Sequence, residues 1–441
     1  MIKKTATKLL KLLVILVIPA YVVYHYIAER IYQANIPMGE VIGPDEDTVM
    51  ADAVAMALNM INMTRDGLIT DDITGDATPR GRDYEKTGET SAGRGGPVVY
   101  RRDVHIKSHG CVKAEFTVPE LDNRYRWGVL SKPDTYKAWI RYSNGDYRLH
   151  PDKQRDARGM AIKLMGVEGE KLLPGQTNAP TQDFVMMNAT NYFIRYLADY
   201  VELTKYLAVG DNFGYFLNGW SKNPFSWRWR ELKLVGGTKK PPPETPLNTQ
   251  YFSASAYKLG PDNNIKFSAK PAQCADSDGQ PVKGKSGSWA TGKDDYNFLR
   301  LRMVEQLESG PACFDFMVQL QVPGKIMPVE DSTIVWSEKD SPFVTVAHIE
   351  IPQQEFNNME QNQFCENLSF NPWHSLPAHR PVGVFNRVRK ALYEEIAKYR
   401  WDANRRQYDN PDAPALIDGE PPEPDSWCIG ASGANCEAAG S

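Results

Sequence analysis

Three residues near the C-terminal end of the chain, Arg389, Tyr393 and Arg400, have a spacing that would let them act together. In an α-helix, at about 100° per residue, this spacing places all three within roughly 40° of one another. Four apolar residues fall on the neighbouring stripe of the same helix: Phe385, Val388, Leu392 and Ile396. The Arg-Tyr-Arg row is therefore expected at the edge of a buried face, where two positive charges need anionic partners.

The tyrosine in this row has the chemistry of an anionic ligand. A phenol has a pKa near 10, so it ionises at neutral pH only beside strong positive charge or a metal. Arg389, one turn before Tyr393, is placed to supply that charge. A tyrosinate is one of the few protein ligands used for haem iron. The alternative interpretation is structural: an arginine that extends from a helix edge over a tyrosine of the core.

Two histidines, His105 and His109, occur together in the segment RRDVHIKSHG. Their spacing places both on one face of a strand, which suits a metal site, but no third His, Cys or Glu lies at a matching spacing. Two other interpretations stay open at this point. The histidines are hydrogen-bonded in a turn, or one of them is a reactive group that faces a cofactor.

Binding of nucleotides or nucleic acids is not expected. The segment GQPVKGKS at residues 279–286 matches the letters of a phosphate-binding loop. It lacks the buried strand before it and the helix after it that aim the amides of such a loop at an anion. The net charge is −4, from 51 basic and 55 acidic residues, so no overall field attracts nucleic acid.

The N-terminus is predicted to anchor the chain in a membrane. An apolar run from Leu9 to about Ile27, interrupted by Lys11, follows a cluster of lysines. This length can span a bilayer if Lys11 extends to the surface. No small-residue cleavage site follows, so we expect an uncleaved signal anchor over residues 9–28. The lysine excess predicts that residues 1–8 stay in the cytoplasm and that the rest is extracytoplasmic, in the periplasm or outside the cell.

The pattern of apolar residues predicts an α+β fold. The chain has 441 residues, 41% of them hydrophobic, enough for one large domain or two smaller ones. Within the segment 29–96 we expect an amphipathic helix over residues 45–66 and then a Gly-rich linker or arm. Helices are also expected at 191–209 and in a segment that ends at Trp401. Roughly eight strand candidates lie in the segments 98–118, 137–150, 158–166, 251–260, 264–271, 313–324 and 343–352.

Eight antiparallel strands can close into a barrel without exposed edges. The tail at residues 402–441 is rich in Pro, Asp and Gly and is expected to lack a core. The chain has six cysteines, an even count that suits an oxidising compartment and allows 15 pairings. Cys428 and Cys436 are the nearest pair and suit a small loop in this tail. The other four either form disulfides or remain free buried thiols.

From about Pro97 to Trp401 the chain resembles the catalase family. The proximal haem ligand of that family lies in the pattern R-x-x-x-Y-x-x-x-x-x-x-R, which Arg389, Tyr393 and Arg400 reproduce. Its distal histidine follows an arginine by three residues, as His105 follows Arg102. Three further matches occur in the family's order: Arg141, Tyr142 and Ser143 in WIRYSN, the block RDARGMAIK at 155–163, and the segments VWSEKDSPFVTVAHIEI and LSFNPWH.

The resemblance implies an antiparallel eight-stranded β-barrel with flanking helices over residues 97–401, and a haem b cofactor. Tyr393 would bind the iron, and Arg389 would hold it as the phenolate. His105 would be the distal acid/base, oriented by Ser143. Three arginines would pair with the haem propionates: Arg102, Arg141 and Arg400.

The chain departs from the family pattern on the distal side. Catalases carry a distal asparagine in an N-N-T-P stretch, whereas this chain has TNAPTQDFV, with Asn178 out of register and Gln182 as a substitute. The P-D-T-H that follows the ligand tyrosine in many catalases is EEIA, and no flavodoxin-like domain follows. These features resemble the divergent, minimal branch of the family.

The expected function is a haem-dependent oxidoreductase that acts on hydrogen peroxide or organic hydroperoxides. One alternative is a membrane-tethered haem-binding protein with little turnover. Another is a lipocalin-like carrier without haem, which would make the motif matches accidental. The sequence leaves open the oxidisable substrate and whether the chain forms a homo-oligomer.

Overall fold

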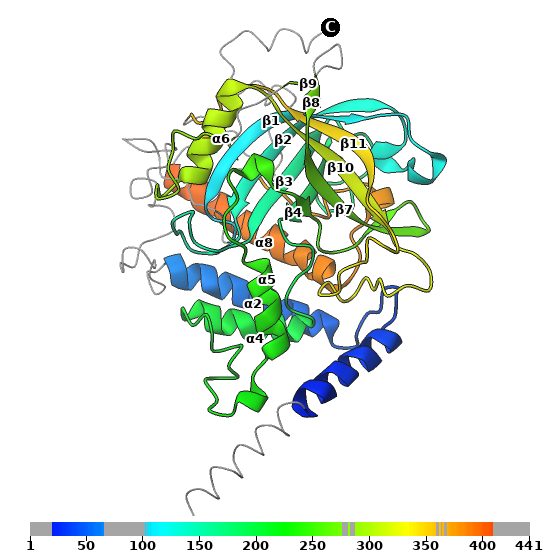
Figure 1. Cartoon of the computed structure of the whole chain (residues 1–441), viewed down its shortest axis with the longest axis vertical. Helices are drawn as coiled ribbons and strands as arrows, with labels where there is room; N and C mark the ends of the chain where they lie inside the picture. Colours follow the sequence, from blue (N-terminus) through cyan, green and yellow to red (C-terminus); the bar gives the residue numbers. More distant parts are fainter. Residues whose placement is uncertain are drawn as a thin grey trace, which may run out of the picture.

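Eight antiparallel strands close into a β-barrel in the computed structural model of the protein (Figure 1). The structure describes residues 20–65, 102, 104–275, 281–282, 287–358, 361–362, 364–365 and 368–408. The barrel strands, in their order around the barrel, are β1 (Ser108–Val118), β2 (Asp134–Asn144), β3 (Arg158–Met165), β4 (Thr181–Met187), β5 (Tyr251–Phe252), β7 (Asn263–Ala272), β10 (Ala312–Leu320) and β11 (Val344–Ile351). Because β11 pairs with β1 and β10 pairs with both β11 and β7, the ring of eight strands is closed. The predicted α+β barrel is confirmed.

The barrel interior is packed with aromatic side chains. Burial alternates along β1 and β10, as expected for strands with one face toward a core. Four phenylalanines, Phe116, Phe184, Phe267 and Phe316, meet in the lumen with ring centres 4.9 to 6.1 Å apart. A lumen filled in this way argues against a lipocalin-like carrier, which needs an interior cavity for its ligand.

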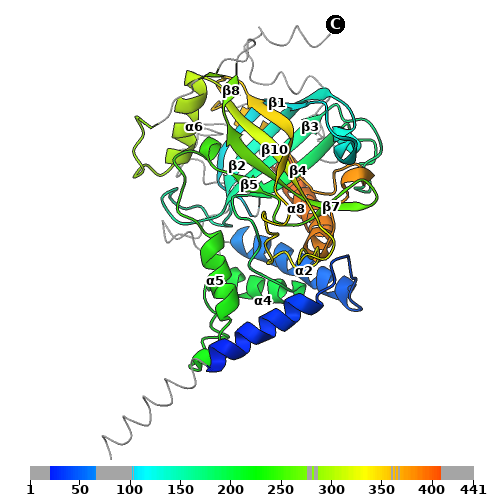
Figure 2. The same ribbon diagram turned by 45° about the vertical axis from the view of Figure 1, so that its right-hand side comes forward.

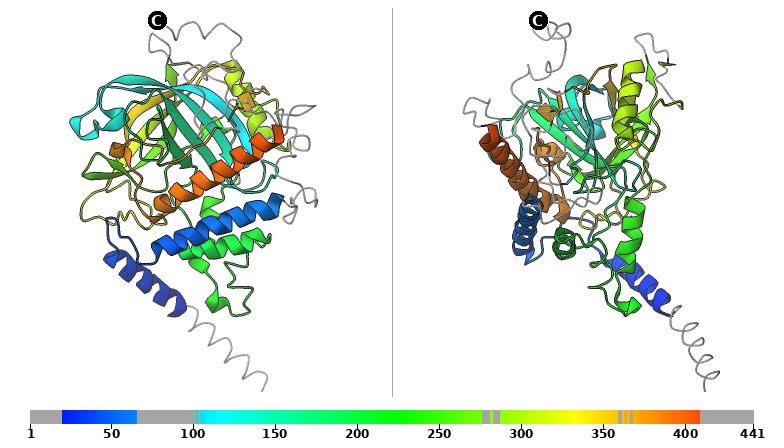
Figure 3. Two further views of the ribbon diagram at one scale, coloured as in Figure 1. Left: turned by 180° about the vertical axis from the view of Figure 1, so that it is seen from behind. Right: turned by 90° about the vertical axis from the view of Figure 1, so that its left-hand side faces the viewer.

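Helices flank the barrel on more than one side (Figure 3). They are α2 (Glu46–Arg65), α4 (Leu197–Ala208), α5 (Trp229–Thr238), α6 (Phe298–Ser309) and α8 (Val384–Tyr408), with a further helix at 20–35. Seen from behind, α8 crosses the barrel, and α2 and α4 lie on the side of α8 that is away from the barrel (Figure 3). Ala53 of α2, Leu197 and Val201 of α4, and Val388 of α8 form the small core that joins the three helices. This packing fixes the face of α8 that is turned to the barrel.

Short elements complete the fold. They are the strands β6 (Tyr257–Leu259), β8 (Cys274–Ala275) and β9 (Pro281–Val282), and the 3₁₀ turns η2 (Asn123–Tyr125), η3 (Gly128–Leu130), η4 (Pro224–Ser226), η5 (Pro246–Asn248) and η6 (Pro377–His379).

Several boundaries differ from the sequence-based expectation. The helix predicted at 191–209 begins only at Leu197, because the preceding backbone is bonded elsewhere, as the Tyr192 amide is to the Ser332 carbonyl. Helix α8 runs to Tyr408, past the predicted end at Trp401. Strand β4 was not predicted because its sequence contains polar residues. It is nevertheless buried, because Asp183 of β4 forms a buried ion pair with Lys163 of β3. Helices α5 and α6 were also missed.

The predicted membrane anchor falls mostly outside the described residues. Residues 1–19 are not described, and the helix at 20–35 contains only the end of the predicted span 9–28. Among the described residues, no helix combines the length and apolar character needed to cross a bilayer. The amphipathic helix predicted over residues 45–66 is confirmed as α2. The predicted Gly-rich linker and nearly all of the C-terminal tail lie outside the described residues.

Two disulfides join segments that are distant in sequence. Cys111 of β1 pairs with Cys365, and Cys274 of β8 pairs with Cys313 of β10. The interpretation of these four cysteines as free buried thiols was therefore wrong. Cys428 and Cys436 lie outside the described residues.

Loss of the Cys111–Cys365 disulfide should destabilise the protein. In the double variant Cys111→Ala/Cys365→Ala, the free energy of unfolding should fall by about 2–5 kcal/mol, because the bridge closes a loop with a sequence separation of 254. Denaturant unfolding measures this. The matched control Cys274→Ala/Cys313→Ala opens a loop with a separation of only 39 and should lose less. An unchanged unfolding midpoint in the first variant would contradict the expectation.

Candidate active site

A cavity of about 430 Å³ lies between the barrel and α8. Its size is in the range of small-molecule and cofactor sites. Its walls come from β2, β3, β4, the segments 102–105, 173–176 and 369–371, and one face of α8. Six of the seven residues predicted from the sequence line it: Arg102, His105, Arg141, Ser143, Tyr393 and Arg400. The seventh, Arg389, lies behind Tyr393.

Tyr393 forms the α8 side of the cavity with Arg389 behind it. The guanidinium carbon of Arg389 lies 5.0 Å from the centre of the Tyr393 ring. Arg389 is buried, and its Nη1 donates to Asn386 Oδ1 over 3.1 Å, which fixes its orientation. Burial alone would lower the pKa of Arg389, but the neighbouring tyrosine hydroxyls raise it well above its usual value. A permanent positive charge is thus held beside the Tyr393 ring.

Two other tyrosines, Tyr192 and Tyr257, interact with Arg389. Burial raises the pKa of Tyr192 to about 12 and also raises that of Tyr257, so both stay protonated at neutral pH. Neither of them lines the cavity. Among the described residues that line it, Tyr393 is the tyrosine. Tyr393 is therefore the tyrosine that is placed to contact a ligand in the cavity.

His105 lies on a different wall of the same cavity. Its Nδ1 contacts Ser143 Oγ at 3.2 Å, so the hydroxyl fixes the orientation of the ring. The backbone of His105 has a φ of 59°, a left-handed conformation that a non-glycine residue adopts only under constraint. Burial, together with the nearby charge of Arg141, lowers the pKa of His105 to about 4. The imidazole is therefore neutral at neutral pH and able to accept a proton.

Three arginines place positive charge around the cavity. Arg102 and Arg400 both donate to the carbonyl of Leu368, Arg400 over 3.0 Å, so the two side chains converge on one wall. Arg102 also donates to the carbonyl of Cys365, which the disulfide ties to β1. Arg141 donates to the carbonyl of His105 over 2.9 Å. Three guanidinium groups in one cavity suit a ligand that carries more than one negative charge.

These side chains fit a haem group. The lining offers a phenol oxygen as a hard ligand for ferric iron, an imidazole, and cationic groups for carboxylates. Between the polar groups the lining is apolar, with Met160, Val185 and Phe370. An apolar wall that ends in guanidinium groups matches a flat apolar ring that carries carboxylates at its edge.

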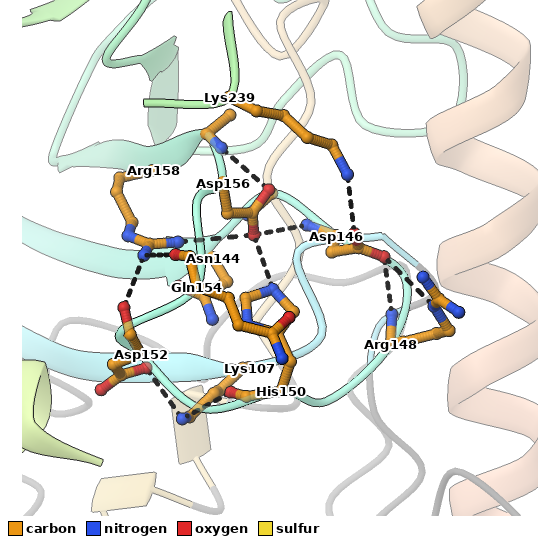
Figure 4. A network of polar contacts seen from close by, with 12 residues as sticks. Lys107, Asn144, Asp146, Arg148, His150, Asp152, Gln154, Asp156, Arg158 and Lys239 are labelled. Carbon is orange, nitrogen blue, oxygen red and sulfur yellow. Dashed lines mark hydrogen bonds and ion pairs between the residues drawn. The ribbon is translucent and has the colours of Figure 1, made fainter. Parts of the chain in front are cut away.

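A buried network of charged residues holds the His105 segment against β2 (Figure 4). The carboxylate of Asp156 accepts from the amides of Gly145 and Asp146, which follow Ser143 at the end of β2, over 3.0 and 3.1 Å. The side chain of Lys107 pairs with Asp152 at 2.8 Å, and the backbone carbonyl of Lys107 accepts a hydrogen bond from the Asn144 amide over 2.9 Å. Both sides of the His105–Ser143 contact are therefore anchored.

The same network shows why Asp156 stays ionised. Burial alone would raise the pKa of Asp156, but the hydrogen bond from His150 and the nearby charge of Arg158 lower it to about 2. Asp146, His150 and Asp156 form the one group of three metal-type ligands among the described residues. Their oxygens already pair with Lys239 and Arg158, so we assign this group to the ion network and not to a cation site.

The zinc interpretation of His105 and His109 is not supported by their placement. His105 lines the cavity, whereas His109 is buried in the network, where its Nε2 contacts Asn144 Oδ1 at 2.8 Å. Burial lowers the pKa of His109 to about 3. Among the described residues, neither histidine belongs to a group of three metal-type ligands. His109 has a structural role, and His105 is left as the histidine of the cavity.

The amide side chains at the cavity are those of Gln176 and Asn371, and neither is one that the sequence suggested as a substitute for the distal asparagine. Gln182 is buried and its Oε1 accepts the Leu376 amide over 3.0 Å, outside the cavity lining. Asn178 is exposed and does not line the cavity either. Gln176, from the segment before β4, does. Its position depends on the path of that segment, for which the sequence carries no local signal.

Gly159 leaves the space that His105 occupies. A Cβ atom at this position would lie 2.8 Å from His105 Nδ1 and 2.8 Å from Ser143 Oγ, closer than real contacts allow. In Gly159→Ala the imidazole must therefore move, and a peroxide reaction that uses it as acid/base should slow by about tenfold or more while haem binding persists. Steady-state kinetics and the haem absorption spectrum measure the two effects. Gly236→Ala, where the added Cβ meets nothing within 4 Å, is the control; equal turnover in both variants would contradict the expectation.

Comparisons with known proteins give a likeness in structure alone. No protein-family model matches the sequence, and no curated protein matches it. Among solved structures, catalase A from Saccharomyces cerevisiae is similar with a TM-score of 0.51 and 17% identity, over 74% of this chain and 69% of that one. A bacterial catalase gives a TM-score of 0.48 and 17% identity over 76% of this chain and 66% of that one.

A fungal catalase gives a TM-score of 0.47 and 16% identity over 73% of this chain. The match spans 62% of the length of that catalase. At such identities the likeness speaks for the fold and not for the activity. Together with the closed eight-stranded barrel and the helix across it, the similarity to the yeast enzyme shows that this chain has a catalase-like fold.

Proposed function

We propose that the protein is a haem-dependent oxidoreductase that acts on hydrogen peroxide or organic hydroperoxides. The observation that carries the proposal is the pairing, in one cavity, of a tyrosine backed by a buried arginine with a neutral histidine. The catalase-like fold supports it. Neither the fold nor the tyrosine alone would be sufficient, since one fold hosts many functions.

The chain's own residues would hold haem b as follows. Tyr393 binds the iron through its phenolate oxygen, and the charge of Arg389 compensates the lost proton. Arg102, Arg141 and Arg400 pair with the propionates. When bound, the haem supplies ferric iron that polarises the peroxide bond and takes up its oxidising equivalents.

His105 moves the proton in the proposed reaction. In the tautomer that donates from Nδ1 to Ser143 Oγ, Nε2 carries no proton and can accept one. Nε2 would take the proton from one peroxide oxygen and return it to the other, so that the oxygen–oxygen bond breaks heterolytically and water or an alcohol leaves, while the remaining oxygen atom, with its two oxidising equivalents, would pass to the haem. Arg141, which donates to the His105 carbonyl, keeps the residue in place during this transfer.

The amide arrangement bears on the substrate. Gln182 is committed to the Leu376 amide, so the expected substitute for the distal asparagine of catalases does not face the cavity. Gln176 provides an amide from another direction. We infer that the site favours peroxidase-type oxidation of an organic donor, or the use of an organic hydroperoxide, over fast disproportionation of hydrogen peroxide. The same observation favours the second candidate, a catalase-fold haem-binding protein with little turnover.

We propose that the domain lies outside the cytoplasm. Two disulfides among the described cysteines suit an oxidising, extracytoplasmic compartment. We propose that the predicted anchor at residues 9–28 tethers the domain there, with residues 1–8 in the cytoplasm. A homo-oligomer is compatible with this arrangement.

Tyr393→Phe should lose haem or its ferric tyrosinate spectrum. A phenyl ring offers iron no donor atom, while the packing of the ring is retained. The absorption spectrum of the purified variant, compared with that of Tyr192→Phe as a control for a tyrosine outside the cavity, measures the effect. An unchanged spectrum in Tyr393→Phe would remove this residue from the site.

His105→Ala should keep haem but reduce the peroxide reaction by about 100-fold or more, the scale of a lost general acid/base. In the wild type, a base with a pKa lowered to about 4 is neutral above that pH. The value of kcat/KM should therefore be level from neutral pH down to about pH 5 and should fall as the pH drops through about 4. An acid limb near pH 6.5, or unaltered turnover in the variant, would refute the role of His105. Full haem spectra without turnover in the wild type would favour the haem-binding alternative.

A further inference from the structure

The segment 209–229, which joins α4 to the first residue of α5, lies at the end of the molecule away from the barrel (Figure 2). We call this segment the aromatic loop. Four large aromatic side chains of this loop are strongly exposed: Phe213 54%, Trp220 60%, Phe225 44% and Trp229 45%. A cluster of this kind on a water-soluble surface points to a contact with an apolar partner.

The loop is built to present these rings. Trp220 Nε1 donates to Asp211 Oδ2 over 2.7 Å, and Trp229 Nε1 donates to the Pro224 carbonyl over 2.7 Å. Both indole groups therefore satisfy their polar atom within the loop and need no water for it. Trp220 has a φ of 61°, a left-handed backbone that is unfavourable for a bulky side chain. The loop thus holds an apolar ring outward at a cost in backbone strain.

The aromatic loop contacts the helix at 20–35. The hydroxyl of Tyr21 donates to the Phe225 carbonyl over 3.1 Å, and the two rings lie 5.0 Å apart. Near this contact the helix exposes Val22, Val23, Tyr24 and Tyr26, each by more than half. The 19 residues that precede the helix include the lysine cluster and most of the apolar run of the predicted anchor. The aromatic loop therefore lies beside the C-terminal end of the predicted anchor, at Tyr21.

We propose that the aromatic loop is a membrane-interface contact that rests on the bilayer beside the anchor. Tryptophan, tyrosine and lysine concentrate at the level of the lipid headgroups, where an amphipathic ring meets both apolar chains and water. The loop has this composition: Lys222 is exposed between Trp220 and Phe225. Its positive charge suits anionic headgroups. With two contacts to the bilayer, the domain has a fixed orientation instead of swinging on a single tether.

Brominated lipids test this contact in the full-length protein. The chain is reconstituted into vesicles of phosphatidylcholine and phosphatidylglycerol, some of which carry bromine on the acyl chains close to the headgroup. Tryptophans near the bromine lose fluorescence. We expect quenching in the wild type, and loss of at least about half of it in Trp220→Phe/Trp229→Phe, which keeps apolar rings but removes the two fluorophores.

The matched control is Trp127→Phe, which removes an exposed tryptophan of the barrel and should leave the quenching unchanged. The single variants Trp220→Phe and Trp229→Phe should each remove part of it, so the test does not depend on one variant folding. Absence of quenching in the wild type, or equal quenching with and without the two tryptophans, overturns the proposal. Emission that depends on protein concentration but not on lipid would assign the loop to contact with a second copy, and would overturn it as well.

Discussion

The buried guanidinium of Arg389 behind the Tyr393 ring is the interaction on which the site depends. A phenol stays protonated at neutral pH unless positive charge is held close to it, and a mobile surface lysine would not be sufficient. Arg389 is buried, oriented by Asn386 and charged at any pH that the protein would meet. The adjacent Tyr192 and Tyr257 do not line the cavity, and burial raises the pKa of each, so both keep their protons.

The rest of the fold keeps a histidine in the cavity that this tyrosine lines. Phenylalanine rings pack together in the lumen of the barrel, and the cavity lies between the outer wall of the barrel and α8. His105 stays in a strained conformation because Asp156 and Lys107 anchor the backbone on both sides of its contact with Ser143. Such a network is costly to bury unless each charge is paired, which is the case here for Lys107 with Asp152. The ion network thus maintains the geometry in which a neutral imidazole can shuttle a proton.

Parts of this site could be predicted because they are local. The Arg-Tyr-Arg row depends only on helical spacing, and α8 presents it as expected. Ser143 and Arg141 share a face of β2 for the same reason. Gln176 could not be found in this way, because its place depends on how the segment before β4 folds. The disulfides join cysteines whose separations, 254 and 39, leave no local signal. Strand β4 was hidden because its polar residues are buried with partners that lie far away in the sequence.

Resonance Raman spectroscopy of the haem-loaded wild type tests the central claim most directly. Excitation into the charge-transfer band should enhance tyrosinate ring modes together with the vibrations of ferric high-spin haem, because a phenolate bound to iron couples to that transition. These modes should shift when the protein is grown on ring-deuterated tyrosine. A spectrum with histidine-ligated haem and no tyrosinate modes, or a protein that takes up no haem, would contradict the account.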